Sequence, residues 1–286
     1  MEFASSDANR WASEDAHSSH FDILIRLAGV RYITLARSAY FLADTQYAIT
    51  RRCPINPIRK IAISTGGGDA PGLNAVIRAI VLSALNRGWE CVGIREGYNG
   101  LLLPAEFPQG GLMPLDRTAV RGITHLGGTI LGTTNRGNPM AFPIVGADGQ
   151  ATTVDRCAEL VDLIHEAGID ALVAIGGDGS LSIANALHQH GLRVVGVPKT
   201  IDNDLDQTVI TFGFDTAVSF ATECVDRLHA TAEAHRRVMV IEVMGRYAGW
   251  IALNTGVSAT ADVILIPEIP YDINKVAEKV LERERN

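Results

Sequence analysis

The sequence is poor in cysteine, and its cysteines form no metal-chelating pattern. Its 286 residues include four, Cys53, Cys91, Cys157 and Cys224. No C-x-x-C pair occurs, and no histidine stands at a zinc-ligand spacing from them. We therefore expect reduced, buried thiols of a cytosolic protein and no zinc site.

Long apolar runs and targeting signals are also lacking. No run of about 18 uninterrupted apolar residues occurs, because charged residues interrupt the most apolar N-terminal stretch, residues 21–43. The N-terminus has acidic residues such as Glu2 and Asp7 where a secretory signal has a basic region. We predict a cytoplasmic protein without a membrane span.

The chain has no surplus of basic residues. Lys and Arg number 25 against 32 Asp and Glu, a net charge of -7. This excludes the general basic surface of a nucleic-acid binder, so any bound anion must be held locally. With 47% hydrophobic and 20% charged residues, the composition is that of a globular protein and a poor fit to disorder, collagen or coiled coil.

Short β-branched runs alternate with helical periodicity from about residue 59 onward. Such uniformly apolar runs suit strands covered on both faces. We predict an α/β fold with a parallel sheet sandwiched by helices in Rossmann-like layers. The expected strands are residues 61–64, 91–95, 171–175, 194–197, 238–243 and 263–266.

Apolar residues at helical spacing stand between these runs. Apolar residues from Leu73 to Ala84 predict a helix with Asp69 as a possible N-cap and Gly88 past its end. Further helices are predicted over 158–165 and 215–235, and an amphipathic stripe runs from Ile273 to Leu281. Because no strand follows that stripe, we expect the second subdomain to be incomplete.

Two prolines close a compositionally distinct N-terminal part. Residues 1–57 are first rich in Ser, Ala and Asp, then apolar with interrupting arginines, and they end in Cys53-Pro-Ile-Asn-Pro57. We predict an N-terminal extension over 1–57 and one domain over 58–286.

Two glycine-rich segments each stand between a predicted strand and a predicted helix. They are STGGGDAPG at residues 64–72 and GGDGS at residues 176–180. Glycines let backbone N–H groups approach an anion, and a helix N-terminus adds partial positive charge, so both favour phosphate binding. Asp178 is then a candidate Mg²⁺ ligand. The alternatives are a purely structural turn and, for Asp178, a cap of a helix beginning near Ser180.

A third polar segment, PKTIDND at residues 198–204, also follows a predicted strand. Its two carboxylates lie two residues apart beside Lys199 and Thr200, and they offer a general base, a cation and a hydroxyl donor. A solvated Asx-type turn would use the same residues.

These three segments and EVMGR at residues 242–246, in this order, resemble the 6-phosphofructokinase family over roughly residues 58–268. The resemblance implies phosphoryl transfer from MgATP to the 1-hydroxyl of fructose 6-phosphate. It implies that Asp202 is the base, that Thr200 and Asp204 help hold the sugar and the transferring group, and that Arg246 stabilises charge. The resemblance also implies that Asp178 binds Mg²⁺.

The resemblance assigns the remaining contacts by position. Contacts to the donor are implied for Gly67, Gly177, Gly179, Ser180 and Lys199, and contacts to the sugar for Met244, Gly245 and Glu268. Arg237 matches an arginine that reaches the sugar phosphate of a neighbouring subunit, which implies a homo-oligomer, a dimer or a tetramer.

Three alternatives stay open. The family's donor-loop arginine aligns with Asn135 or Arg136, and we favour Arg136 because a cation neutralises donor phosphate. Pyrophosphate users resemble this chain at Lys199 but have Asp where it has Gly179; we favour ATP, since Gly179 leaves room for an α-phosphate. The family's His-x-Gln-Arg-Gly-Gly motif is absent, so a catalytically incomplete nucleotide-binding subunit is the third possibility. Trp250 is expected in the core.

Overall fold

The computed structural model describes residues 57–145 and 150–285. The chain divides into two units, Met1–Ile55 and Asn56–Asn286, and the first lies outside the described residues. The predicted extension and Cys53 fall there, so the boundary near residue 57 stays a prediction.

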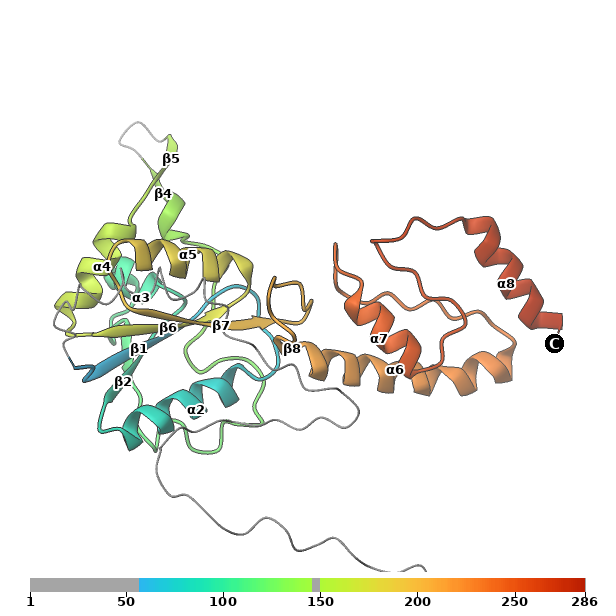
Figure 1. The fold of residues 1–286 in the computed structure, drawn as a ribbon, viewed down its shortest axis with the longest axis horizontal. Helices are drawn as coiled ribbons and strands as arrows, with labels where there is room; N and C mark the ends of the chain where they lie inside the picture. The colour runs from blue at the N-terminus through green and yellow to red at the C-terminus, as the bar shows by residue number, and fades with distance from the viewer. Residues whose placement is uncertain (1–56, 146–149, 286) are drawn as a thin grey trace, which may run out of the picture. The chain divides into compact units, whose positions relative to one another are not determined.

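A mostly parallel sheet forms the centre of the described unit (Figure 1). Its six strands lie in the order β3-β2-β1-β6-β7-β8, and only β3 runs antiparallel to its neighbour. The predicted strands at 61–64, 91–95, 171–175 and 194–197 are confirmed as β1, β2, β6 and β7. The strand bounds are β1 Lys60–Thr65, β2 Glu90–Ile94, β3 Leu112–Pro114, β6 Ala171–Gly176, β7 Val194–Thr200 and β8 Phe212–Gly213.

The helices link these strands as the periodicity predicts. The stretches at 73–84, 158–165, 215–235 and 273–281 all lie in helices. The helix bounds are α2 Leu73–Asn86, α3 Asn99–Leu102, α4 Cys157–Glu166, α5 Asp178–Gln189, α6 Phe214–His235, α7 Trp250–Ser258 and α8 Ile273–Arg285, with short 3₁₀ turns at Pro104–Glu106 and Pro139–Ala141.

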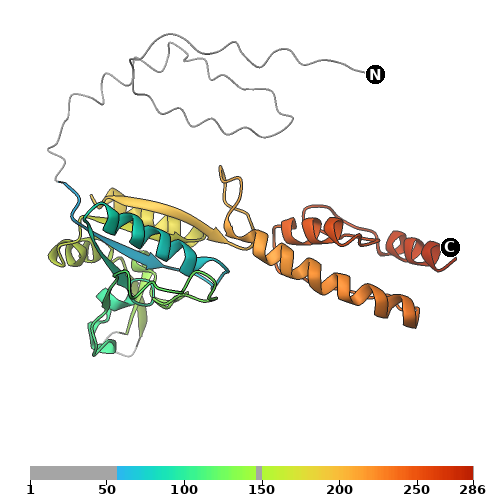
Figure 2. The ribbon, with the colours of Figure 1, turned by 90° about the horizontal axis from the view of Figure 1, so that it is seen from below.

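Alternating side chains of the sheet fill two hydrophobic clusters, one on each face. Ile61 and Ile63 pack with α2, whereas Ala62 between them packs with α4 and α5 on the opposite face. Figures 1 and 2 show the same division, with α2 on one side of the sheet and α4 and α5 on the other. The three-layer α/β fold predicted from the sequence is confirmed.

Two predicted strands are wrong. Residues 238–243 and 263–266 form no ladder in the described structure. Val240 is 92% exposed, and an isolated apolar run has no neighbour to pair its N–H and C=O groups. At the sheet edge Val195 of β7 is 60% exposed, so this strand is not covered on both faces as expected.

Several local predictions also fail. Gly72, not Asp69, is the N-cap of α2, and it supplies no side-chain bond. Helix α5 begins at Asp178 rather than near Ser180. Cys91 and Cys157 are buried as expected, and burial raises the pKa of each thiol to about 12, but Cys224 is exposed on α6. Its position on a face without a packing partner accounts for that difference.

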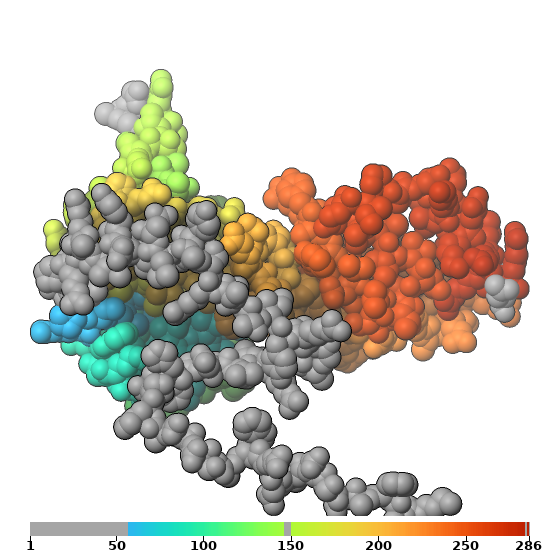
Figure 3. All heavy atoms as spheres, viewed as in Figure 1, coloured from blue at the N-terminus to red at the C-terminus, as the bar shows by residue number. Residues whose placement is uncertain are grey.

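A hairpin that the sequence pattern did not predict lies between β3 and β6 in the chain. Strands β4 (Phe142–Val145) and β5 (Ala151–Val154) pair with each other and with no other strand. The hairpin stands clear of the sheet in Figures 1 and 3, in keeping with the exposure of Ile144 and Val145. Arg156 stacks over Phe142 at 4.7 Å and anchors its base.

The central strand supplies a test of the packing. Leu172 is fully buried in β6, so Leu172→Ala should lower the free energy of unfolding by about 2–5 kcal/mol through lost burial and a cavity. The matched change Leu281→Ala, on the half-exposed side of α8, should cost about 0.5 kcal/mol. Urea denaturation of the whole chain measures both, and equal losses would contradict this placement of the core.

Candidate active site

The three polar segments predicted from the sequence meet at one edge of the sheet. Strands β1, β6 and β7 are adjacent and parallel, so their carboxyl ends lie side by side. The Gly66 N–H donates to the Ile175 carbonyl oxygen at 3.0 Å, and Lys199 Nζ donates to the Gly68 carbonyl oxygen at 2.5 Å. The glycine-rich turns and the 198–204 segment therefore share one site.

Two glycines make this approach possible because Ser180 fills the space beside them. A Cβ on Gly66 would lie 2.6 Å from Ser180 Oγ, and a Cβ on Gly176 would lie 2.3 Å from Ser180 Cβ. Both distances are too short for non-bonded atoms. Absent side chains at Gly66 and Gly176 thus let the first turn of α5 pack directly against the turn after β1.

Two N–H groups of the turn after β1 donate to carbonyl oxygens of the protein, whereas the sequence predicts that they bind an anion. The Gly66 N–H is bound to Ile175, and the Gly67 N–H donates to the Thr134 carbonyl oxygen at 3.2 Å. Gly67 has a φ of 81°, a left-handed conformation that glycine adopts readily. These two N–H groups are not free to bind an anion, so Gly67 shapes the turn.

The N-terminus of α5 offers the free donors instead. No side chain caps it: Gly177 is the N-cap, and the Leu181 N–H makes the first intrahelical bond to the Gly177 carbonyl oxygen. The helix therefore leaves the N–H groups of Asp178, Gly179 and Ser180 without intrahelical partners. With the helix dipole they make this end favourable for an anion.

Lys199 brings a buried positive charge to the same edge. Its side chain is only 4% exposed, and burial lowers the pKa of its ammonium group, an effect that Asp69 partly offsets. A Cβ on Gly67 would lie 3.7 Å from Lys199 Nζ, which places the cation against the glycine-rich turn. The groups available to bind an anion at this edge are thus the ammonium group of Lys199 and the N-terminus of α5.

Asp202 lies at the start of the loop after β7 and carries an unsatisfied oxygen. Asp202 Oδ1 is buried without a hydrogen-bond partner among the described residues. Burial raises the pKa of its carboxyl group, and the nearby charge of Asp204 raises it further. A carboxylate that is desolvated in this way is a stronger base than a solvated one, which suits proton abstraction.

The loop that holds Asp202 is closed by its own polar side chains. Thr211 Oγ1 donates to the Thr200 carbonyl oxygen at 2.6 Å, and the Thr211 N–H donates to Asn203 Oδ1 at 2.9 Å. The Asp202 N–H donates to Thr200 Oγ1 at 3.2 Å. These bonds keep Thr200 and Asp202 at the end of β7, beside Lys199.

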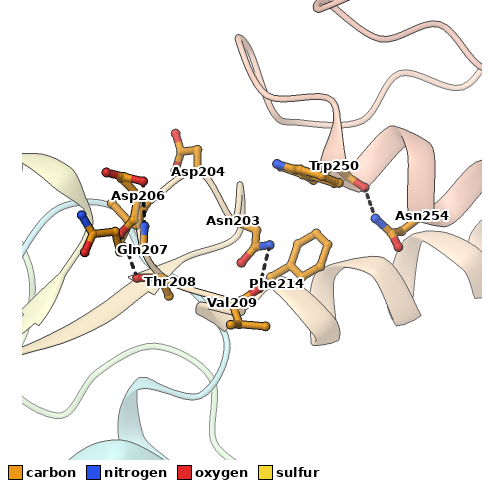
Figure 4. A pocket seen from close by; sticks show the side chains of 10 residues that line it. Asn203, Asp204, Asp206, Gln207, Thr208, Val209, Phe214, Trp250 and Asn254 are labelled. Carbon is orange, nitrogen blue, oxygen red and sulfur yellow. Dashed lines mark hydrogen bonds between the residues drawn. The ribbon is translucent and has the colours of Figure 1, made fainter. Parts of the chain in front are cut away.

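A cavity of about 570 Å³ opens beyond this loop (Figure 4). Asp204 and the residues up to Val209 line one side, and Trp250 and Asn254 of α7 line the other. Trp250 is 47% exposed, so its predicted place in the core is wrong.

The remaining predicted site residues lie away from the two glycine-rich turns. Glu268 Oε1 accepts from the Gly249 N–H at 2.7 Å, and the Arg246 guanidinium stacks on Tyr247 at 4.9 Å. Met244 and Arg237 are exposed. No described contact joins these four side chains, or Gly245, to Asp202 or Lys199. Their roles stay predictions.

Arg136 is exposed on the loop whose Thr134 carbonyl oxygen accepts from the Gly67 N–H. Its N–H donates to Thr134 Oγ1 at 2.9 Å. The role of Arg136 as the donor-loop residue stays a prediction.

The described residues contain neither a cluster of metal-ligating side chains nor a helix suited to a membrane. No group of three or more His, Cys, Asp or Glu side chains lies close enough there to hold a metal ion. Asp178 is accordingly a single exposed carboxylate at the start of α5. Within the same residues no helix has the length and apolarity needed to cross a bilayer.

The fold and site define a mostly parallel α/β protein whose sheet edge brings together glycine-rich turns, a helix N-terminus and a buried lysine. The chain belongs to the phosphofructokinase family, whose profile matches residues 60–286.

Its relatives include users of both donors by name. It is 52% identical over 231 residues to ATP-dependent 6-phosphofructokinase 2 of Clostridium perfringens, covering 80% of this chain and 62% of that protein. It is 49% identical to the pyrophosphate–fructose 6-phosphate 1-phosphotransferase of Streptomyces coelicolor, covering 79% and 61%. This chain thus spans about three fifths of the length of such relatives.

A solved structure agrees with the fold. The T-state phosphofructokinase of Pichia pastoris superposes with a TM-score of 0.67 at 34% identity, covering 80% of this chain and 25% of that one. The recognition of the family from four short motifs is confirmed.

The contact between Gly66 and Ser180 gives a second test. Gly66→Ala should lower the free energy of unfolding by about 1–3 kcal/mol, because its Cβ would overlap Ser180 Oγ. Ser180→Gly should restore part of that loss in the double variant. Gly179→Ala is the control, since a Cβ there meets no atom within 4 Å. Additive energies in the double-mutant cycle would refute the contact.

The raised pKa of Asp202 predicts a pH-dependent effect on stability. A carboxyl with a folded-state pKa above its ordinary value of 3.8 binds more protons when folded, so stability falls as pH rises through that window. Asp202→Asn should therefore raise the melting temperature at neutral pH, and the gain should vanish below pH 3.8. Asp226→Asn, exposed on α6, should show no such gain. A melting-temperature difference that is constant with pH would count against the assignment.

Proposed function

We propose that this chain carries the donor site and the catalytic base of an ATP-dependent 6-phosphofructokinase. The reaction is transfer of the terminal phosphoryl group of MgATP to the 1-hydroxyl of fructose 6-phosphate, giving fructose 1,6-bisphosphate and ADP in glycolysis. The observation that carries the proposal is the meeting of the α5 N-terminus, buried Lys199 and unsatisfied Asp202 at one sheet edge.

The donor polyphosphate binds at the N-terminus of α5. The N–H groups of Asp178, Gly179 and Ser180 supply hydrogen bonds, and Lys199 supplies a buried charge. Gly67 and Gly177 shape the two turns, and Arg136 adds a second cation. Mg²⁺ fits this site, since it is commonly held by one or two carboxylates together with substrate phosphates. The ion would neutralise part of the phosphate charge. Asp178 would hold it.

Asp202 accepts the proton of the sugar 1-hydroxyl as the sugar oxygen forms its bond to the terminal phosphorus and the bond to the ADP oxygen breaks. Positioning and charge stabilisation supply most of the rate in such transfers. Thr200 and Asp204 orient the reacting groups around Asp202, and Arg246 stabilises the transferred charge. The unsatisfied Oδ1 of Asp202 supports the role of base.

Gly179 supports ATP over pyrophosphate as the donor. It lies in the first turn of α5 with no atom within 4 Å of a built Cβ, so the turn has space for the α-phosphate and the nucleoside beyond it. Lys199 attracts either donor. The pyrophosphate-dependent reaction is the second candidate. Pyrophosphate users of the family resemble this chain at Lys199, and that lysine contacts the glycine-rich turn directly.

The sugar phosphate needs residues beyond the donor edge. We assign sugar contacts to Met244, Gly245 and Glu268, and we assign Arg237 to the site of a neighbouring subunit in a cytoplasmic homo-oligomer, a dimer or tetramer. Exposure of Met244 and Arg237 agrees with contacts outside the described fold. A catalytically incomplete nucleotide-binding subunit is a further candidate, because no described contact joins Arg237, Met244 or Glu268 to Asp202 or Lys199.

A coupled assay with fructose 6-phosphate separates these candidates. Turnover with MgATP and little with pyrophosphate supports the proposal, and the reverse preference supports the pyrophosphate enzyme. MgATP binding in calorimetry without fructose 1,6-bisphosphate formation supports the nucleotide-binding subunit. Binding of neither donor would overturn all three.

Asp202→Asn tests the base. The variant should lower kcat at least about 100-fold while the Kd for MgATP stays within about twofold, because an amide cannot accept the hydroxyl proton. Asp226→Asn, exposed on α6, should leave both values unchanged. Equal losses of kcat and MgATP affinity in Asp202→Asn would argue that Asp202 supports the donor site and is not the base.

A further inference from the structure

The loop at residues 132–136 holds Gly67 from both sides. The Gly67 N–H donates to the Thr134 carbonyl oxygen at 3.2 Å, and Thr133 Oγ1 donates to the Gly67 carbonyl oxygen at 2.6 Å. One of these two bonds is made by a side chain. It can therefore be removed without changing the backbone.

The bond from Thr133 fixes a peptide plane that would otherwise turn easily. In a trans peptide the C=O of Gly67 and the N–H of Gly68 belong to one plane and point in opposite directions. Neither glycine has a side chain to restrict rotation of that plane. By holding the Gly67 carbonyl oxygen, Thr133 thus sets the direction of the Gly68 N–H.

The next plane is held in the same way by a different side chain. Lys199 Nζ donates to the Gly68 carbonyl oxygen and so sets the direction of the Asp69 N–H. Two consecutive planes of the glycine-rich turn are each held by one side chain, Thr133 on one loop and Lys199 on β7. The role of Lys199 follows from its charge, whereas Thr133 is neutral and can act here only through its bond.

The loop itself does not depend on Thr133. Thr65 Oγ1 donates to the Gly132 carbonyl oxygen at 2.7 Å, and the Arg136 N–H donates to Thr134 Oγ1. The first bond anchors the loop to β1 just before Thr133, and the second closes the turn just after it. Loss of the Thr133 hydroxyl should therefore loosen the glycine-rich turn while leaving the fold intact.

We propose that Thr133 is a positioning residue that holds the glycine-rich turn in its phosphate-binding conformation. It acts through the carbonyl oxygen of Gly67 and has no contact of its own with the donor. The link to phosphate binding rests on the proposed function; the link to the conformation of Gly67 does not.

Donor affinity in the whole chain gives the first test. Thr133→Val keeps the shape and removes the hydroxyl, so the Kd for MgATP in calorimetry should rise about three- to tenfold, the loss expected for one hydrogen bond. Thr133→Ser should restore the wild-type Kd. Thr222→Val, which removes a 2.8 Å bond to the Val218 carbonyl oxygen in α6, should leave it unchanged.

Amide exchange of the ligand-free protein gives a second test that needs no donor. The Gly67 amide should exchange faster in Thr133→Val than in the wild type, and at the wild-type rate in Thr133→Ser. Unchanged Gly67 exchange in Thr133→Val would overturn the inference, as would an equal loss of MgATP affinity in the Val and Ser variants. Absence of MgATP binding by the wild type would instead overturn the proposed function.

Discussion

The close approach of Ser180 to the backbone at Gly66 and Gly176 is the constraint on which the site depends. It brings the turn after β1 against the first turn of α5, and it is possible only where side chains are absent. The parallel register of β1, β6 and β7 supplies the edge, but the register alone would leave room between the turns. The contact of the Ser180 side chain with the two glycines removes that room and brings the N-terminus of α5 to the turn that Lys199 also contacts.

The charges at this edge favour anion binding only when a cation binds with the anion. The helix N-terminus and Lys199 are positive, whereas Asp178, Asp202 and Asp204 are negative. A polyphosphate close to these carboxylates would be repelled unless a cation lay between them. This charge pattern supports the proposal of a donor that arrives with its metal, with Asp178 as the proposed carboxylate ligand.

The sequence predicted the four central strands, the principal helices and the convergence of three turns, because these follow from local apolar patterns and from parallel topology. It failed where pairing or packing partners decide the outcome. The run at 238–243 has strand propensity but no neighbour, and Trp250 is apolar but lines a cavity. The glycine-rich motif predicts N–H groups that bind an anion, since nothing in it reveals that the N–H groups of Gly66 and Gly67 donate to Ile175 and Thr134.

Asp202, the proposed base, depends on a rigid loop. Its buried oxygen has no partner, so a mobile loop would turn the carboxylate toward water and return its pKa to the ordinary range. Asn203 prevents this by adopting a left-handed φ of 53° and accepting the Thr211 N–H, while Thr211 also binds the Thr200 carbonyl oxygen. The backbone strain at Asn203 and the desolvation of Asp202 are thus two parts of one arrangement, in which local instability maintains a reactive carboxylate.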